Sequence, residues 1–409
     1  MTGREDRSGV PTGFLMDNYP PQPVTFVRGE GSRLWDVEGK VYLDFLGGLA
    51  VTSLGHAHPV VAEAIAEQAR TLLHVCNLYG TTIGPEVAET LDRLIGVGGQ
   101  VRPAGEPNGR VFFANSGAEA NECAIKLARK WGGGAGRGRY GHGRYAVVST
   151  YGSFHGRTLA ALAATGQPSK HEPFQPMPEG FRHVALGGID AMDAAVDPRI
   201  VAAVLVEPIQ GEGGVNVPPK GWLADVRRLC DERDVLLILD EVQTGLGRTG
   251  DWFGFQHEGI RPDIVTLAKA LGNGMPIGAC WARAEVATAF VPGDHGTTFG
   301  GQPLAAAAAR ATLAVMEAEN VPVRAARAGA RLSEGLAALP GVTSVRGRGL
   351  LLAAELADRP SRDVAAAALD GGLVVNPVTP TAIRLAPSLL VSDAEIDEAL
   401  AVLERLVSC

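Results

Sequence analysis

The chain has 409 residues, of which 46% are hydrophobic and 20% are charged, values typical of an ordered globular protein with room for a large domain and a smaller one. The formal net charge of -8 and the absence of a long Lys or Arg run argue against a surface that binds nucleic acid or an anionic membrane. We therefore expect the partner to be a small molecule.

The five cysteines are odd in number and scattered, at Cys76, Cys123, Cys230, Cys280 and Cys409. Their spacing suits neither a disulfide framework nor a zinc site, so we expect free thiols and no metal. The first ten residues, MTGREDRSGV, lack the apolar core of a signal peptide, and no apolar stretch reaches the length of about 18 residues that spans a bilayer. These features predict a cytoplasmic protein.

In the middle of the chain, short apolar runs repeatedly precede helix-like segments. This alternation predicts an α/β fold with a mainly parallel sheet. The runs lack the period-two pattern of a half-exposed strand, which indicates strands covered by helices on both faces. Ligands of such sheets collect at the carboxyl ends of the strands. The clearest runs are RVFFA at 110–114, YAVVS at 145–149, AAVLV at 202–206 and VLLIL at 235–239.

The first of these strands leads through a Ser-Gly-Ala turn, Ser116 to Ala118, into a predicted helix. Backbone N–H groups and the dipole at a helix start attract phosphate. Many turns of this kind bind no ligand, so the turn by itself predicts a phosphate site only in combination with other residues.

The second strand leads into SFHGRT, which contains an aromatic ring and a guanidinium three residues apart. Phe154 is suited to stacking on a planar ring. Arg157 is suited to binding a carboxylate in two places, and the alternative is an ordinary salt bridge between lobes.

The strand VLLIL ends at Asp240 and Glu241, and Lys269 follows in the segment DIVTLAKALGNGMPIGA. An isolated lysine is usually a surface charge, but apolar neighbours lower the pKa of an amine and leave it nucleophilic toward an aldehyde. An aspartate beside a pyridine nitrogen keeps that ring protonated. The combination of Lys269 and Asp240 therefore indicates pyridoxal phosphate.

Beyond about Ala306 an alanine-rich helical segment, further strands and a final helix predict a second, smaller lobe. The final helix starts at a capping box formed by Ser392 and Glu395. We expect residues 76–305 to form the large cofactor-binding domain, and residues 1–75 and 306–409 to form the small domain together.

Read in order, several segments resemble the successive motifs of the class III pyridoxal-phosphate-dependent aminotransferases. The match extends over nearly the whole chain and includes FFANSGAEANECAIKLAR, SFHGRTLAALAATGQP, VEPIQGEGG, LLILDEVQTGLGRTG, TLAKALGNGMPIGA and HGTTFGGQPLA. Within that class, GGLAVTSLGHAHP, GRTGDWF and IRLAPSLLVSDAEID are most similar to the acetylornithine aminotransferases of arginine biosynthesis.

The resemblance implies fold type I, with a mainly parallel seven-stranded sheet in the large domain and a small α/β domain built from both termini. It also implies a homodimer whose active sites are shared between subunits. Lys269 would be the catalytic residue and hold the cofactor as a Schiff base. The other implied cofactor contacts are Asp240 at the ring nitrogen, Gln243 at the ring hydroxyl, Phe154 on the ring face, Gly117 and Ala118 at the phosphate, and Thr298 at the phosphate of the neighbouring subunit.

For substrates, the resemblance implies that Arg157, with Thr297 nearby, binds the α-carboxylate. Arg384 would form a second carboxylate site, which Glu212 shields until a dicarboxylate such as 2-oxoglutarate arrives. The implied reaction moves the terminal amino group of N-acetyl-L-ornithine to 2-oxoglutarate. One departure from the family is Gln302, where asparagine is common. Tyr19 is either a substrate contact, as in related ornithine enzymes, or a packed aromatic.

Other interpretations remain open at this point. Within the class, the amino donor could be ornithine, succinylornithine, 4-aminobutyrate or another ω-amine, and an aminomutase shares the same fold. Outside it, the chain could be a silent cofactor-binding regulator, which the complete set of Lys269, Asp240 and Arg157 disfavours. A nucleotide-binding protein is disfavoured because the Ser116 turn lacks a GxGxxG or GxxxxGK[ST] motif.

Overall fold

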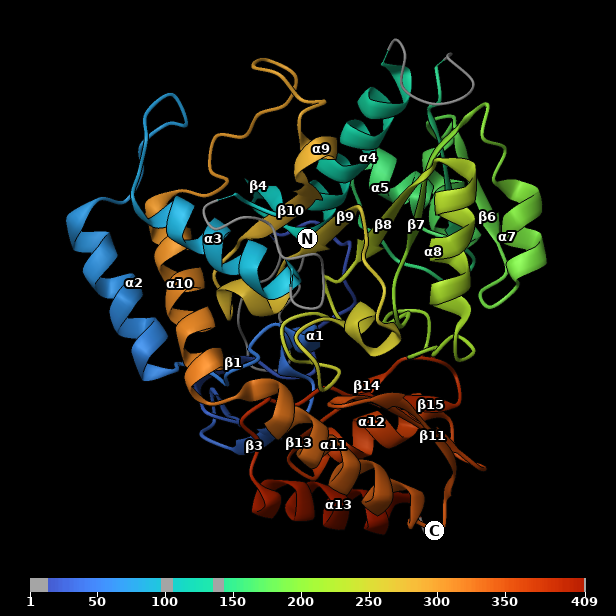
Figure 1. Cartoon of the computed structure of the whole chain (residues 1–409). Helices are drawn as coiled ribbons and strands as arrows, with labels where there is room; N and C mark the ends of the chain where they lie inside the picture. The colour runs from blue at the N-terminus through green and yellow to red at the C-terminus, as the bar shows by residue number, and fades with distance from the viewer. Residues whose placement is uncertain (1–13, 97–105, 135–142, 408–409) are drawn as a thin grey trace.

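The computed structural model in Figure 1 describes residues 14–96, 106–134 and 143–407. The beginning of the expected N-terminal segment, residues 1–13, and Cys409 lie outside the described residues. The chain folds into a large lobe around a central sheet and a smaller lobe that contains the C-terminal elements (Figure 1).

The large lobe is built on a seven-stranded sheet with the order β4-β10-β9-β8-β7-β5-β6. Only β10 is antiparallel to its neighbours, and the remaining pairs are parallel. The four strands predicted from apolar runs correspond to β4, β5, β7 and β8, which confirms the mainly parallel α/β sheet. The strands are β4 (Gly109–Ala114), β5 (Ala146–Thr150), β6 (Phe181–Val184), β7 (Val201–Val206), β8 (Leu236–Asp240), β9 (Ile264–Leu267) and β10 (Gly278–Arg283).

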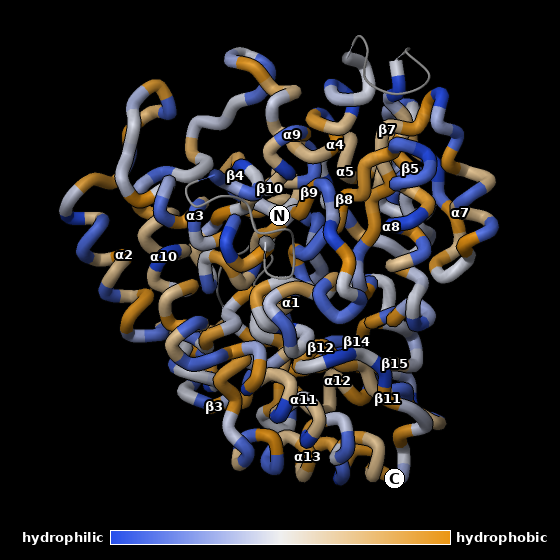
Figure 2. The backbone as a smooth tube through the Cα atoms, in the orientation of Figure 1, coloured by the Kyte–Doolittle hydropathy of each residue, from blue (hydrophilic) through white to orange (hydrophobic). Residues whose placement is uncertain are grey.

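Both faces of this sheet are buried, which explains the continuous apolar runs. Every residue of β7 and β8 is buried, and successive residues enter different core clusters: Leu237 belongs to one cluster and Ile238 to the other. Figure 2 shows hydrophobic residues along the central strands, whereas the outer helix α13 alternates between hydrophobic and hydrophilic turns. The helices of this lobe include α3 (Ile83–Gly96), α4 (Gly117–Gly133), α5 (Leu159–Ala164), α6 (Pro168–His171), α7 (Ile189–Ala195), α8 (Trp222–Arg233) and α9 (Ala284–Ala287).

The small lobe is built from segments near both ends of the chain. Strand β13 (Leu373–Val374) pairs in parallel with β3 (Val41–Asp44), so the sheet β1-β2-β3-β13 contains strands from both termini. A second sheet has the order β11-β12-β15-β14. The remaining elements are β1 (Phe26–Glu30), β2 (Arg33–Asp36), β11 (Val342–Arg348), β12 (Leu351–Leu356), β14 (Asn376–Pro377), β15 (Ala382–Leu385), α11 (Val321–Ala337), α12 (Ser361–Asp370) and α13 (Asp393–Val407).

The expected capping box at the start of α13 is confirmed. Ser392 N donates to Glu395 Oε2 at 2.8 Å, and Glu395 N donates to Ser392 Oγ at 3.3 Å. The two bonds satisfy backbone N–H groups that have no partner within the helix.

A long helix, α10 (Pro303–Ala318), runs between the lobes and packs against α2 (Pro59–Thr71) and α3 (Figure 1). The predicted domain boundary at 305/306 falls inside this helix, so the division at that residue stays a prediction. The short elements are α1 (Gly47–Ala50) and the 3-10 turns η1 (Glu172–Phe174), η2 (Gly254–Glu258) and η3 (Lys269–Gly272).

In the described part of the chain, no helix has the length and apolar character needed to cross a membrane. The four cysteines in that part are free thiols, of which Cys76 is exposed and the other three are buried.

Candidate active site

A cavity of about 370 Å³ opens at the carboxyl ends of the central strands, where the sheet type predicts a ligand site. Val51 and five separate segments line it: the turn into α4, the loop after β5, the loop after β7, the residues after β8 and the residues after β9. The predicted site residues that line this cavity are Gly117, Ala118, Phe154, Arg157, Glu212, Asp240, Gln243 and Lys269.

Lys269 lies two residues beyond the end of β9 and has a φ of 42°, a left-handed backbone conformation that is costly for a residue with a Cβ atom. Burial is the largest influence on its amine and lowers the pKa of Lys269, outweighing the carboxylates of Glu212 and Asp240 that raise it. In the described residues the structure records no hydrogen bond to Lys269 Nζ. A larger fraction of this amine is therefore neutral at a given pH, as a nucleophile or a proton acceptor requires.

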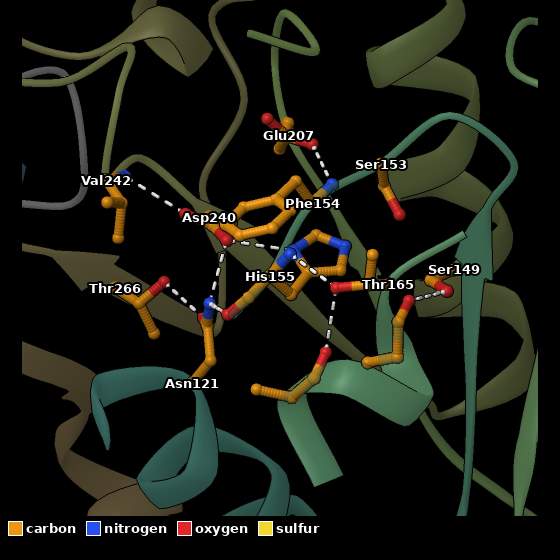
Figure 3. Close-up of polar contacts among 12 residues, drawn as sticks. Asn121, Ser149, Ser153, Phe154, His155, Thr165, Glu207, Asp240, Val242 and Thr266 are labelled. Atoms are coloured by element: carbon orange, nitrogen blue, oxygen red, sulfur yellow. Dashed lines mark hydrogen bonds and ion pairs between the residues drawn. The ribbon is translucent and has the colours of Figure 1, made fainter. Parts of the chain in front are cut away.

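Asp240 ends β8 and is held by three groups (Figure 3). Asn121 Nδ2 donates to Asp240 Oδ2 at 2.8 Å, His155 Nδ1 lies 2.8 Å from the same oxygen, and Val242 N donates to Oδ1 at 3.0 Å. Thr266 Oγ1 in turn donates to Asn121 Oδ1 at 2.7 Å. Because Asp240 is only 4% exposed, these contacts are what compensate its carboxylate for the loss of water.

The sequence interpretation did not assign roles to Asn121, His155 or Thr266. Asn121 offers one recognisable signal, since it is a buried amide beside Ala120 and Ala124 on an otherwise apolar face of α4. His155 lies next to Phe154, yet nothing in the sequence indicates that its ring reaches Asp240.

The turn into α4 presents backbone N–H groups to the cavity. Ser116 Oγ accepts from Glu119 N at 3.2 Å and so caps the helix, which leaves Gly117 and Ala118 at its start. A Cβ atom on Gly117 would lie 2.9 Å from the Val242 side chain. Glycine is therefore needed for the turn to approach the segment after β8. This arrangement is suited to binding an anion at the start of a long helix.

Phe154 and Arg157 lie together at the mouth of the cavity. The guanidinium carbon of Arg157 is 5.5 Å from the centre of the Phe154 ring, a cation–π contact. Arg157 is exposed and, among the described residues, takes part in no ion pair, so the alternative of an interlobe salt bridge does not describe its position. Its fork is available to a carboxylate.

The predicted second carboxylate site joins the two lobes. Arg384, on β15 of the small lobe, is 1% exposed, and its Nη1 lies 2.7 Å from Glu212 Oε1 of the large lobe. The same guanidinium donates to Gly211 O at 3.1 Å, Gln243 Oε1 at 3.2 Å and Asn376 Oδ1 at 2.8 Å. Burial raises the pKa of Glu212, but Arg384 and nearby positive charge bring it below its ordinary value, so the carboxylate is ionised beside the arginine.

Thr297 and Thr298 do not line the cavity of their own chain. Thr297 Oγ1 accepts from Asn115 Nδ2 at 3.3 Å, and Asn115 does line the cavity, whereas Thr298 is exposed. The predicted contact of Thr298 with a neighbouring subunit's cofactor stays a prediction.

The two positions set apart in the sequence also have defined surroundings. Gln302 is buried, accepts from Val75 N at 2.9 Å and donates to Asn77 Oδ1 at 3.0 Å, so its longer side chain ties down a surface segment. Tyr19 is 73% exposed and does not line the cavity.

The residues present fit pyridoxal phosphate. The amine of Lys269, without a hydrogen-bond partner in the described chain, faces a cavity that also receives a buried carboxylate from Asp240. The start of α4 supplies an anion site, and Phe154 and Val242 supply apolar surface for a planar ring. The three functional groups of the cofactor thus each have a suitable counterpart: Lys269 for the aldehyde, Asp240 for the pyridine nitrogen and the start of α4 for the phosphate.

Comparisons with known proteins agree with this geometry. The family described as "Aminotransferase class-III" matches residues 15–407. The acetylornithine aminotransferase of Methanothermobacter thermautotrophicus is 47% identical over 399 residues, which cover 97% of this chain and 96% of the relative.

Two solved structures are also similar. The acetylornithine aminotransferase of Elizabethkingia anophelis is 34% identical, with a TM-score of 0.82 and coverage of 96% of each chain. The ornithine aminotransferase of Toxoplasma gondii, with partial occupancy of PLP at its active site, is 35% identical, has a TM-score of 0.87 and covers 96% of this chain and 92% of its own.

Proposed function

Because the chain belongs to the class III aminotransferases, a pyridoxal-phosphate-dependent family, we propose that it transfers the terminal amino group of N-acetyl-L-ornithine to 2-oxoglutarate, in arginine biosynthesis. The observation that carries the proposal is the pairing of the buried Arg384 with the half-buried Glu212 beside Lys269 and Asp240. It joins a second carboxylate site to the cofactor site. The identity of 47% to an acetylornithine aminotransferase supports the choice of amino donor.

Pyridoxal phosphate, when bound, supplies an aldehyde that captures amines and a protonated ring that accepts electrons. Lys269 would hold it and, once its amine is free, carry a proton to and from the reacting carbon of the substrate. Asp240 would face the ring nitrogen, positioned by Asn121 and His155. Gly117 would present its backbone to the phosphate.

The two arginines would divide the recognition of carboxylates between them. Arg157, exposed at the cavity mouth, would bind the carboxylate far from the reacting carbon, which is the α-carboxylate of the donor and the distal carboxylate of 2-oxoglutarate. Arg384, close to Lys269, would form the second carboxylate site and bind the carboxylate attached to the reacting carbon of 2-oxoglutarate after Glu212 moves away. The donor has no carboxylate on its reacting carbon, so Glu212 would stay paired with Arg384. One cavity would then accept two substrates of different charge.

We also propose a homodimer with shared sites. Thr298 is exposed. Two nearby segments of the same chain also carry large apolar residues that are more than half exposed: Leu78, Tyr79 and Phe299. Asn77 Nδ2 donates to Thr297 O at 3.0 Å, which links the two segments. A charged substitution, Tyr79→Glu, should yield monomers in light scattering and lower activity. The free thiols favour a reducing cytoplasm as the compartment.

A substrate panel tests the proposed reaction. Initial rates with acetylornithine, ornithine, succinylornithine and 4-aminobutyrate, each with 2-oxoglutarate, should give the highest kcat/KM for acetylornithine. Ornithine is the second candidate, since the similarity to the ornithine enzyme extends over nearly the whole chain. A higher kcat/KM for ornithine would replace the proposed donor, and pyruvate accepted as well as 2-oxoglutarate would contradict the role of Arg157 in binding the distal carboxylate of 2-oxoglutarate.

A further inference from the structure

Glu207 is a buried carboxylate in the wall of the cavity that the proposed reaction does not yet use. It follows β7 directly, is 5% exposed and lines the cavity. Its Oε1 accepts from Phe154 N at 2.9 Å, and its Oε2 accepts from Gly211 N at 3.1 Å. Each oxygen therefore binds the backbone of a different loop, and Figure 3 shows the first of these contacts.

The backbone of Gly211 continues the connection to the small lobe. Gly211 N donates to Glu207, and Gly211 O accepts from Arg384 Nη1 at 3.1 Å. A Cβ atom on Gly211 would lie 1.9 Å from Gln243 Oε1, so this residue is packed tightly against Gln243. An uninterrupted hydrogen-bonded chain thus runs from Phe154 through Glu207 and Gly211 to Arg384.

We propose that Glu207 is a positioning residue that couples the aromatic wall at Phe154 to the Glu212 and Arg384 site, and that it thereby sets the affinity for the dicarboxylate substrate. The inference rests on the proposed function, because it takes Arg384 as the site for the second carboxylate. Gly211 directly precedes Glu212. A fixed Gly211 backbone therefore sets the position of the Glu212 side chain, which must move away from Arg384 when a dicarboxylate binds and pair with it again afterwards. A fixed Gly211 carbonyl also orients the guanidinium of Arg384.

The charge environment makes this coupling depend on protonation. Burial raises the pKa of Glu207 to about 7, with His155 lowering it and Asp240 raising it. Lys269 is a further charged group close enough to interact with Glu207. Protonation places an O–H on one oxygen and removes the negative charge, so the carboxyl becomes a weaker acceptor for Phe154 N and Gly211 N. The coupling is therefore about half formed near pH 7, strengthens as the pH rises above it and is lost as the pH falls below it.

Glu207→Gln reproduces the protonated state at every pH, and Glu241→Gln is its matched control. Glu241 is equally buried, accepts from Gly254 N and Phe255 N at 3.0 Å each, and has its pKa raised by burial to about 7. It does not line the cavity. Any effect of removing a buried carboxylate from this sheet edge appears in both variants.

Amide hydrogen exchange of the holoenzymes tests the connection without any substrate. In Glu207→Gln, exchange should accelerate in the segments around Phe154 and Gly211, and in Glu241→Gln only around Gly254 and Phe255. Unchanged exchange at Gly211 in Glu207→Gln would overturn the coupling.

Calorimetric titration with glutarate, an unreactive dicarboxylate, tests the consequence. Glu207→Gln should bind it about tenfold more weakly than wild type at pH 8 and should lose the decline in affinity that wild type shows below pH 7. Equal losses in Glu241→Gln, or wild-type affinity in Glu207→Gln, would overturn the proposal. Wild-type enzyme that binds glutarate no better than an Arg384→Ala variant would instead contradict the proposed acceptor, and the exchange data then decide the coupling on their own.

Discussion

Replacing Glu212 by glutamine should tighten the binding of dicarboxylates, because it removes the charge that competes for Arg384. In the resting site Glu212 Oε1 lies 2.7 Å from Arg384 Nη1, and an incoming carboxylate must displace it. A hydrogen bond to a charged group contributes about 1.5–3 kcal/mol, equivalent to a factor of about 10–150 in Kd. The side chain of Glu212 is 28% exposed, so solvent screening places the effect near the lower end, about tenfold.

The assay is calorimetric titration of the holoenzymes with glutarate. Glu398→Gln serves as control, because it breaks a similar ion pair, with Arg33 at 2.5 Å, in the small lobe and outside the cavity. We expect a lower Kd in Glu212→Gln and an unchanged Kd in the control. A Kd in Glu212→Gln that equals or exceeds the wild-type value would refute the idea that Glu212 competes with the substrate for Arg384.

Three further predictions follow from the site and its supports. Lys269→Ala should reduce turnover by more than about 10⁴-fold and abolish the absorbance of the Schiff base between the lysine and the cofactor, so normal turnover would disprove its role. Asn121→Leu removes one donor to Asp240 and should lower kcat about tenfold while leaving the Kd for glutarate unchanged. An unchanged kcat with a raised Kd for glutarate would instead place Asn121 in substrate binding. Burial raises the pKa of Glu241 from 4.5 to about 7. The free energy of unfolding of wild type should therefore fall by about 3 kcal/mol relative to that of Glu241→Gln as the pH rises from about 4.5 to 7. A difference in unfolding free energy, measured by urea titration, that stays constant across that range would contradict this.

The local features of the sequence predicted much of the fold and the centre of the site. Apolar runs without alternation identified β4, β5, β7 and β8, because strands buried on both faces have no polar side. Asp240 could be assigned because a residue directly after a buried parallel strand lies at the edge where ligands bind. The role of Lys269 was inferred from its apolar neighbours and Asp240 and strengthened by the order of motifs, whereas that of Arg384 came from the resemblance alone. In the structure Lys269 and Asp240 line the same cavity, and Arg384 pairs with Glu212.

The supporting contacts could not be predicted in this way, because they join residues that are far apart in the sequence. Asn121 and His155 reach Asp240 from α4 and from the loop after β5, and their meeting depends on the order of strands in the sheet. The local sequence around a polar residue in a helix or loop does not indicate which distant residue it will hydrogen-bond to after folding.

What the sequence alone determined is the chemistry available at each strand end and helix start, since periodicity and turn residues act over a few neighbouring positions. Only the tertiary structure decided which of these groups share a cavity. It brought Arg384 of the small lobe against Glu212 of the large lobe, and it placed Glu207 between Phe154 and Gly211. Such contacts form when the two lobes and separate loops pack together, because burying these polar groups requires each to find a partner.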